Sequence, residues 1–116
     1  MSAQLACLTA DVPACGTLRV ELEAATGMVE IAVVRAEDGV LHAISDVCSH
    51  GAVSLAEGEV EGSTIECWLH GSRFDLRTGA PTSLPAVRPV PVYPLIVDGE
   101  RVLVDVDAPL VTGKEN

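Results

Sequence analysis

Two Cys and two His side chains stand in two short motifs whose composition suits a metal centre. Cys48 and His50 form the first motif, C-S-H, and Cys67 and His70 form the second, C-W-L-H. Paired thiolates suit ferric iron and sulfide, whereas neutral imidazoles suit an iron that is more easily reduced. The four side chains together therefore predict one metal centre with mixed sulfur and nitrogen ligands.

These ligands predict a single [2Fe–2S] cluster in which Cys48 and Cys67 bind one iron while His50 and His70 bind the other. When two His replace two Cys on one iron, the reduction potential rises. The rival interpretation is a structural zinc site, because two Cys and two His also form a zinc ligand set. Zinc motifs usually keep like ligands together, as C-x2–4-C followed by H-x3–5-H, whereas each motif here mixes both types. A zinc-bound, non-redox binding module is therefore the alternative from a different functional class.

A glycine directly follows each of the two His ligands. Gly51 and Gly71 stand at these positions. Glycine lets the backbone turn tightly and brings N–H groups close to cluster sulfurs. This repeated feature argues against four unrelated buried residues.

The segment 46–79 resembles the cluster-binding subdomain of Rieske proteins, with C-S-H-G, then C-W-L-H-G-S-x-F-D, then an R-T-G turn. Most of the chain, residues 5–106, is similar to the small Rieske ferredoxins of bacterial ring-hydroxylating dioxygenases in aromatic hydrocarbon catabolism. The resemblance implies an all-β Rieske fold, in which an antiparallel β-sandwich base carries a small inserted β cluster-binding subdomain. We expect one domain over residues 1–116, with the cluster-binding subdomain at about 46–86, the base sheet at 4–45 and 87–106, and a tail at 107–116.

The resemblance also implies a function. We expect an electron-transfer protein that carries single electrons from a flavin-dependent ferredoxin reductase to a terminal Rieske oxygenase, a non-haem iron enzyme. The alternatives in the same class are the Rieske small subunit of a nitrite reductase and a redox partner in iron–sulfur assembly. No catalytic residue is predicted, since the sequence has no Ser/His/Asp arrangement, no nucleotide loop and no 2-His-1-carboxylate iron site.

The residues around the predicted ligands indicate a low reduction potential. High-potential Rieske proteins resemble C-x-H-x-x-C and C-x-C-H, and their extra Cys form a disulfide. Val53 and Leu69 occupy those positions here, so that disulfide cannot form. Those proteins also place a Ser and a Tyr hydroxyl near the cluster, whereas this chain keeps Ser72 but has Phe74. Because a lost hydrogen bond destabilises the reduced state, we expect a potential near the bottom of a window of roughly −150 to +300 mV.

Three further residues are predicted to lie near the ligands. Leu84 and Pro85 match the proline-bearing loop that packs over the cluster in the family. Trp68 is interpreted either as a docking anchor or as a side chain that packs against the base or the Leu84-Pro85 loop, and packing is favoured. Exposed Trp is enriched at interfaces.

The composition and net charge limit the classes of partner that this chain can bind. The chain has 116 residues, 48% of them hydrophobic, with a formal net charge of -10. That charge argues against nucleic acid and anionic membranes, and it is compatible with steering toward a positively charged protein partner. We find no apolar run long enough to span a membrane and no secretory signal at the start, so we expect a cytoplasmic protein. We also expect it to be a monomer.

Alternating apolar and polar residues predict the strands that must position the motifs. The expected strands are residues 4–9, 18–22, 29–35, 40–44, 64–68, 73–76, 92–97 and 101–106. The acidic stretch 52–62 is expected to be a solvated loop. Cys7 and Cys15 are interpreted as structural thiols rather than a disulfide, and His42 as a side chain without a functional role.

Overall fold

The computed structural model describes residues 3–25, 27–47, 53–68, 71–82, 89–107 and 109–110. Over these ranges the chain forms ten β-strands and two 3-10 helices, and no α-helix occurs among them. The strands are β1 (Gln4–Leu8), β2 (Thr17–Ala24), β3 (Gly27–Arg35), β4 (Leu41–Ser45), β5 (Glu59–Glu61), β6 (Thr64–Glu66), β7 (Arg73–Asp75), β8 (Val92–Tyr93), β9 (Leu95–Asp98) and β10 (Arg101–Val104). The short helices are η1 (Thr9–Asp11) and η2 (Leu55–Glu57). The all-β class predicted from the sequence is confirmed.

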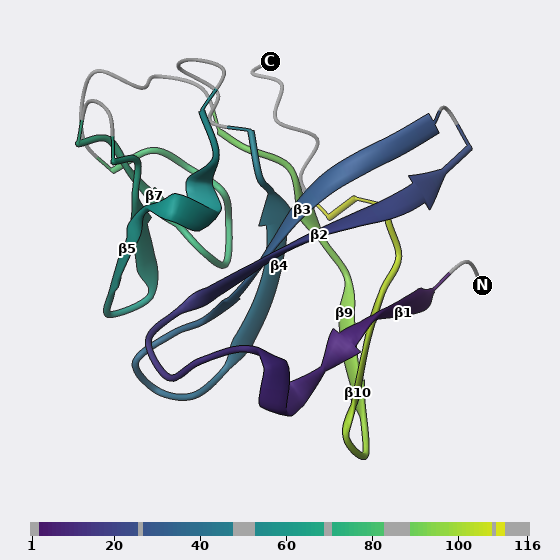
Figure 1. Ribbon diagram of the computed structural model, residues 1–116. Coiled ribbons are helices and arrows are strands. Elements are labelled where there is room, and N and C mark those ends of the chain that lie inside the picture. The colour runs from purple at the N-terminus through teal and green to yellow at the C-terminus, as the bar shows by residue number, and fades with distance from the viewer. Residues whose placement is uncertain are drawn as a thin grey trace.

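The strands form three antiparallel sheets (Figure 1). The central sheet has four strands in the order β2-β3-β4-β8, and a second sheet has the order β1-β10-β9. The third sheet, β5-β6-β7, lies on the left of Figure 1, on the opposite side of β4 from β9 and β10. The third sheet falls inside the segment 46–86 expected to bind the cluster, whose exact boundaries stay a prediction.

Strand β3 is apolar because both of its faces are covered. Its alternate residues belong to two different buried clusters. The cluster toward β1-β10-β9 includes Ile31, Val33, Ala43, Val102 and Val104. The cluster toward β5-β6-β7 and η2 includes Ala32, Val34, Ile44, Leu55, Ile65 and Phe74. A strand covered on both sides has a continuous rather than alternating apolar run, which explains the buried strand predicted for residues 29–35.

The stretch 92–97, predicted to be one strand, is divided between two sheets at Pro94. Strand β8 pairs with β4 in the central sheet, while β9 pairs with β10 in the second sheet. Proline has no backbone N–H to donate to a sheet ladder, so it favours the point where the chain leaves one sheet for another. The sequence showed the proline but not that its neighbours pair with different strands.

The acidic stretch 52–62 is more ordered than the expected solvated loop. Within its described part, Leu55 begins η2 and is fully buried. Residues 59–61 form β5, in which Val60 pairs with Ile65 of β6 while Glu59 and Glu61 flank it. The expectation was wrong because the Glu residues were interpreted as a solvated run. They are the polar positions of a Glu-Val-Glu alternation, which is typical of a half-buried strand.

The described part of the expected tail is tied to the base. The Asp107 carboxylate accepts a hydrogen bond of 2.8 Å from the Ala25 N–H. The Leu110 N–H donates one of 2.7 Å to the Val92 carbonyl in β8. Within the described ranges, neither 3-10 helix has the length or apolar character needed to cross a bilayer.

Candidate metal centre

One of the four predicted ligands, Cys67, lies in the described part of the chain. The predicted site residues outside the described ranges are Cys48, His50, Gly51, Leu69, His70, Leu84 and Pro85. The structure describes Gly71, Ser72 and Phe74 around Cys67, together with the residues on both sides of the segment 48–52. The site is therefore built from the elements that flank the two ligand motifs.

The second ligand turn, residues 67–72, joins two paired strands. Cys67 directly follows β6 and Ser72 directly precedes β7. The Cys67 N–H donates to the Ser72 carbonyl at 2.6 Å, and the Gly71 N–H donates to the Cys67 carbonyl at 2.9 Å. Backbone hydrogen bonds between strands already in register therefore fix the position of the thiol.

Gly71 has a backbone conformation that other residues adopt only with strain. Its φ is +77°, in the left-handed region. A residue with a Cβ at such a φ is disfavoured by contact with the neighbouring carbonyl. This conformation supports the sequence interpretation in which the glycine after His70 allows a tight turn.

Cys67 is buried in apolar surroundings as a free thiol. It belongs to the same buried cluster as Ile65, Phe74 and Leu55, and its relative exposure is 0%. Ser72 is also fully buried. A buried thiol at the base of a tight turn fits a thiolate that binds an iron–sulfur centre, because soft sulfur ligands suit such centres and burial limits solvent access. Phe74 packs in this cluster as well, so the residue that replaces Tyr lies in the buried surroundings of the ligand.

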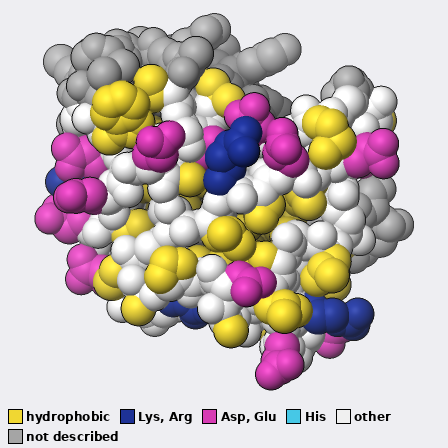
Figure 2. All heavy atoms as spheres, viewed as in Figure 1, with side chains coloured by type: hydrophobic (Ala, Val, Ile, Leu, Met, Phe, Trp, Pro, Cys, Tyr) yellow, Lys and Arg dark blue, Asp and Glu magenta, His cyan; other side chains and the backbone are white. Residues whose placement is uncertain are grey.

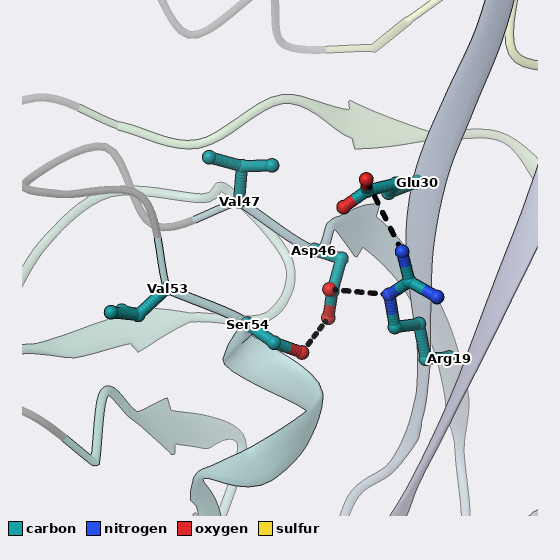
Figure 3. Close-up of a pocket in the computed structure, with 6 residues that line it drawn as sticks. All are labelled: Arg19, Glu30, Asp46, Val47, Val53 and Ser54. Atoms are coloured by element: carbon teal, nitrogen blue, oxygen red, sulfur yellow. Dashed lines mark hydrogen bonds and ion pairs between the residues drawn. The ribbon is translucent and has the colours of Figure 1, made fainter.

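The first ligand segment leaves the central sheet at Asp46, directly after β4. This side chain is 1% exposed. Its Oδ1 accepts hydrogen bonds from the Ser54 hydroxyl and the Ala56 N–H, both at 2.9 Å. Its Oδ2 accepts one from Arg19 Nε at 3.2 Å, as Figure 3 shows. The carboxylate thus contacts both the returning chain and strand β2.

Arg19 is shared between the buried carboxylate and a more exposed one. Its Nη2 lies 3.2 Å from Glu30 Oε1 and 3.9 Å from Glu21 Oε2. The hydrogen bond and charge of Glu30 are the foremost causes that raise the pKa of Arg19, with smaller contributions from Glu21 and Asp46. Sequence analysis missed Arg19 and Asp46. The available signal was a charged residue directly after the apolar run of β4 and two positions before Cys48.

Trp68 is exposed beside the second ligand turn. Its relative exposure is 52%. It lines a hollow of about 240 Å³ together with Glu57, Glu59 and Glu66. The structure exposes half of Trp68 next to three carboxylates, which favours the docking interpretation, whereas the expected contact with the Leu84-Pro85 loop lies outside the described residues.

Arg73 balances part of this acidic surface. Its Nη2 lies 3.1 Å from Glu66 Oε1 and its Nη1 lies 3.5 Å from Glu61 Oε1. No ion pair is recorded for Glu57 or Glu59 within the described residues. The surface beside Trp68 therefore keeps negative charge.

The other candidate residues do not gather into a second centre. Cys7 and Cys15 are free thiols, as expected, and burial raises the pKa of Cys7, with a smaller contribution from Asp11. His42 in β4 is half-buried, and desolvation lowers its pKa. In the described ranges, no three His, Cys, Asp or Glu side chains are grouped so that they could hold a metal ion.

Known proteins similar to this chain share one domain type. The family model for the Rieske [2Fe–2S] domain matches residues 2–94. The 3-phenylpropionate/cinnamic acid dioxygenase ferredoxin subunit of Escherichia coli (strain K12) is 38% identical over 101 residues, covering 86% of this chain and 90% of the relative.

Two solved structures extend the likeness to the fold. The ferredoxin of carbazole 1,9a-dioxygenase from Nocardioides aromaticivorans IC177 is 36% identical, with a TM-score of 0.77 over 90% of this chain and 97% of that chain. A chain in the complex of reduced oxygenase and oxidized ferredoxin in carbazole 1,9a-dioxygenase is 34% identical, with a TM-score of 0.78 over 88% of this chain and 100% of that chain.

Proposed function

This chain belongs to the Rieske [2Fe–2S] domain family, and we propose that it carries single electrons from a flavin-dependent reductase to a terminal non-haem iron oxygenase. It is a ferredoxin, an electron-transfer component rather than a catalyst, and its cofactor is one [2Fe–2S] cluster. The observation that carries the proposal is the likeness to a dioxygenase ferredoxin subunit along 86% of this chain and 90% of that subunit. The cytoplasmic location and the monomeric state expected from the sequence belong to the same proposal.

In this proposal Cys48 and Cys67 bind one iron, and His50 and His70 bind the other. The burial of Cys67 at the base of the second ligand turn supports its role. The cluster supplies a one-electron redox centre whose potential is higher with two neutral His ligands than with four Cys. The chain's own contribution is to hold the ligands rigidly and to exclude water from the sulfur side, which the apolar cluster around Cys67 does.

The proposed potential lies near the lower end of the Rieske window of roughly −150 to +300 mV. Two features support it. Val53 and Leu69 stand where high-potential relatives have disulfide cysteines, and the buried Phe74 offers no hydroxyl to the ligand sulfur. A redox titration followed by electron paramagnetic resonance tests this directly. We expect a rhombic signal on reduction near the lower end of the window, whereas the same signal at a clearly positive potential would contradict the low-potential assignment.

The same titration tests the cofactor. A colourless protein with stoichiometric zinc and no signal on reduction would contradict the proposed function altogether. The four predicted ligands would then bind zinc rather than a [2Fe–2S] cluster.

The surface proposed for partner docking is the acidic hollow beside Trp68. Figure 2 shows acidic side chains gathered at the left of the molecule, over the sheet β5-β6-β7 of Figure 1. An exposed Trp next to carboxylates suits a basic side chain of a partner, which gains both charge attraction and contact with the aromatic face. This surface adjoins the second ligand turn, so a partner bound there would be close to the redox centre.

Electron transfer to a purified ring-hydroxylating oxygenase tests this docking surface. Trp68→Ala is expected to raise the ferredoxin concentration needed for half-maximal transfer by about tenfold, because Trp side chains are frequent hot spots of binding. Val97→Ala is the matched control, since Val97 is 51% exposed on β9 in a different sheet. The transfer rate should also fall as salt rises. Equal behaviour of the two variants would contradict docking at Trp68.

A further inference from the structure

We propose that Asp46 is the positioning residue of the first ligand pair, because its buried carboxylate joins both ends of the segment 48–52 and fastens them to strand β2. The proposal rests on the proposed function, since that segment contains Cys48 and His50. Its basis is the described residues on either side of the segment, which we call the neck: 46–47 where the chain leaves the sheet and 53–56 where it returns.

The neck is closed by contacts that Asp46 makes across it. The Ser54 hydroxyl and the Ala56 N–H both donate to its Oδ1 at 2.9 Å. The Leu55 N–H donates to the Asp46 carbonyl at 2.6 Å, and Val47 forms an isolated bridge with Ser54. One residue on the outgoing chain therefore binds three consecutive residues of the returning chain.

The same residue fastens the neck to the central sheet. Arg19 Nε of β2 donates to Asp46 Oδ2 at 3.2 Å. The Asp46 N–H donates to the Glu30 carbonyl of β3 at 3.0 Å. The two chain ends that flank the ligand segment are thus attached to strands β2 and β3 of the base. These two strands form the longest regular ladder among the described residues.

Apolar packing does not replace these contacts on the open side of the neck. A hollow of about 380 Å³ lies there, lined by Arg19, Glu30, Asp46, Val47, Val53 and Ser54. Figure 3 shows Val47 and Val53 on the two sides of the neck, with the Asp46 carboxylate between Ser54 and Arg19. Burying a carboxylate is costly unless it is fully hydrogen-bonded, and charge-assisted hydrogen bonds are stronger and more directional than neutral ones. The carboxylate therefore defines the separation of the chain ends where side-chain packing leaves them open.

The replacement Asp46→Asn tests this role with little change in shape. All three groups that contact the carboxylate are donors, whereas an amide has only one acceptor oxygen and places an N–H₂ group against another donor. Glu30→Gln is the matched control. It removes an ion pair with the same Arg19 at the same 3.2 Å, but the Glu30 side chain has no recorded hydrogen bond to the neck among the described residues.

The measurements use the cluster-containing protein. Cluster release into an excess of iron chelator is followed by visible absorbance, and the reduced proteins are compared by electron paramagnetic resonance. We expect Asp46→Asn to release the cluster about tenfold faster than wild type, as for a loss near 1.4 kcal/mol, with shifted or broadened resonance positions. Glu30→Gln should stay within about twofold of wild type with an unchanged spectrum.

Ser54→Ala provides a second variant that removes a single contact of the same carboxylate. It should speed cluster release less than Asp46→Asn and shift the spectrum in the same direction. Far-UV circular dichroism and the guanidinium denaturation midpoint report on the rest of the fold. Both signals should remain close to those of wild type.

Either of two results would overturn the proposal. Asp46→Asn could match Glu30→Gln in release rate and spectrum, or it could lose the base signals together with the cluster, which would make Asp46 a general structural residue. Failure of the proposed function is distinct, because wild type itself would then lack the rhombic signal.

Discussion

The two ligand motifs are held by different physical means. The second ligand turn is closed by backbone hydrogen bonds between Cys67 and Ser72 and between Gly71 and Cys67. The neck of the first segment has one such bond, from the Leu55 N–H to the Asp46 carbonyl, and adds the side chain of Asp46, which contacts Ser54, Ala56 and Arg19. The proposed metal centre thus has two supports, which we expect to differ in their sensitivity to mutation.

The difference follows from where each motif is placed in the sheets. Strands β6 and β7 pair with each other, so their ladder sets the turn between them. The first segment instead connects β4, in the central sheet, to η2 and then β5, in the third sheet. Among the described residues on either side of it, the single bridge between Val47 and Ser54 is the only strand-type pairing that joins its two ends. In this connection between sheets, the buried Asp46 side chain supplies part of the constraint that strand pairing supplies between β6 and β7.

Truncation of one side chain in each support gives the largest expected contrast. Asp46→Ala leaves the partly buried Ser54 hydroxyl and Ala56 N–H without their acceptor, which is expected to cost about 2–3 kcal/mol in total. Ser72→Ala removes one buried hydroxyl but keeps the carbonyl that accepts from the Cys67 N–H, so its expected cost is that of one side-chain hydrogen bond, about 1 kcal/mol. Guanidinium denaturation midpoints of the two variants measure this. Equal shifts of the two midpoints would show that the neck and the second ligand turn depend equally on side-chain contacts.

The second turn should instead be sensitive to backbone conformation. Gly71→Ala places a Cβ on a residue with a φ of +77°, with an expected cost of about 1–2 kcal/mol. Gly62→Ala is a suitable control, because Gly62 also has a positive φ, +59°, but belongs to the β5–β6 turn. Both variants should lose stability, while only Gly71→Ala should speed cluster loss. Similar cluster loss in both would contradict a specific role of the second turn.

A hydroxyl added beside the second ligand should change the redox potential rather than the fold of the turn. Phe74→Tyr is expected to raise the potential by about 60 mV, equivalent to one hydrogen bond of about 1.4 kcal/mol gained in the reduced state. Phe74 and Cys67 belong to the same buried cluster, which is the basis for expecting the added hydroxyl to reach the sulfur. Protein-film voltammetry measures the shift. A potential that is unchanged or lower would refute the account of the low potential.

The smallest expected effect lies in the base and in neither ligand turn. Desolvation is the main cause that lowers the pKa of His42, while Asp38 and Asp75 oppose this effect and Arg77 adds to it. A lowered folded-state pKa means that the unfolded chain binds the proton more tightly. His42 therefore contributes stability above its unfolded pKa of about 6.5 that is lost as the pH falls toward its folded value.

Melting temperatures of wild type and His42→Gln between pH 7.5 and 5 measure this loss. The decline on acidification should be smaller in the variant. If both decline in parallel, other groups account for the acid sensitivity.

The alternation of residues predicted several parts of the fold well. The apolar run of β3 indicated a buried strand, and the structure covers that strand on both faces. The same approach failed for residues 59–61, where acidic side chains concealed a strand, and at Pro94, where one apolar stretch serves two sheets. At residues 59–61 the local Glu-Val-Glu pattern was present but was interpreted as solvated charge, although β5 pairs with the adjacent β6. At Pro94 the error came from a distant pairing partner, because β8 pairs with β4, which lies about fifty residues earlier and leaves no local pattern.

The identity of a metal centre depends on the types of its ligands and on their short spacing, and both can be read from the sequence. Two Cys and two His in mixed pairs, each pair followed by glycine, are enough to predict the cofactor and the family. The role of Asp46 depends instead on groups from β2, β3 and η2 that meet only after folding. The exposure of Trp68 beside Glu57 and Glu59 was likewise decided by the tertiary structure. The residue types and short spacings within each motif are local in the sequence, so they can predict the cofactor. Burial and charge environment arise only when segments that are distant in the sequence pack together.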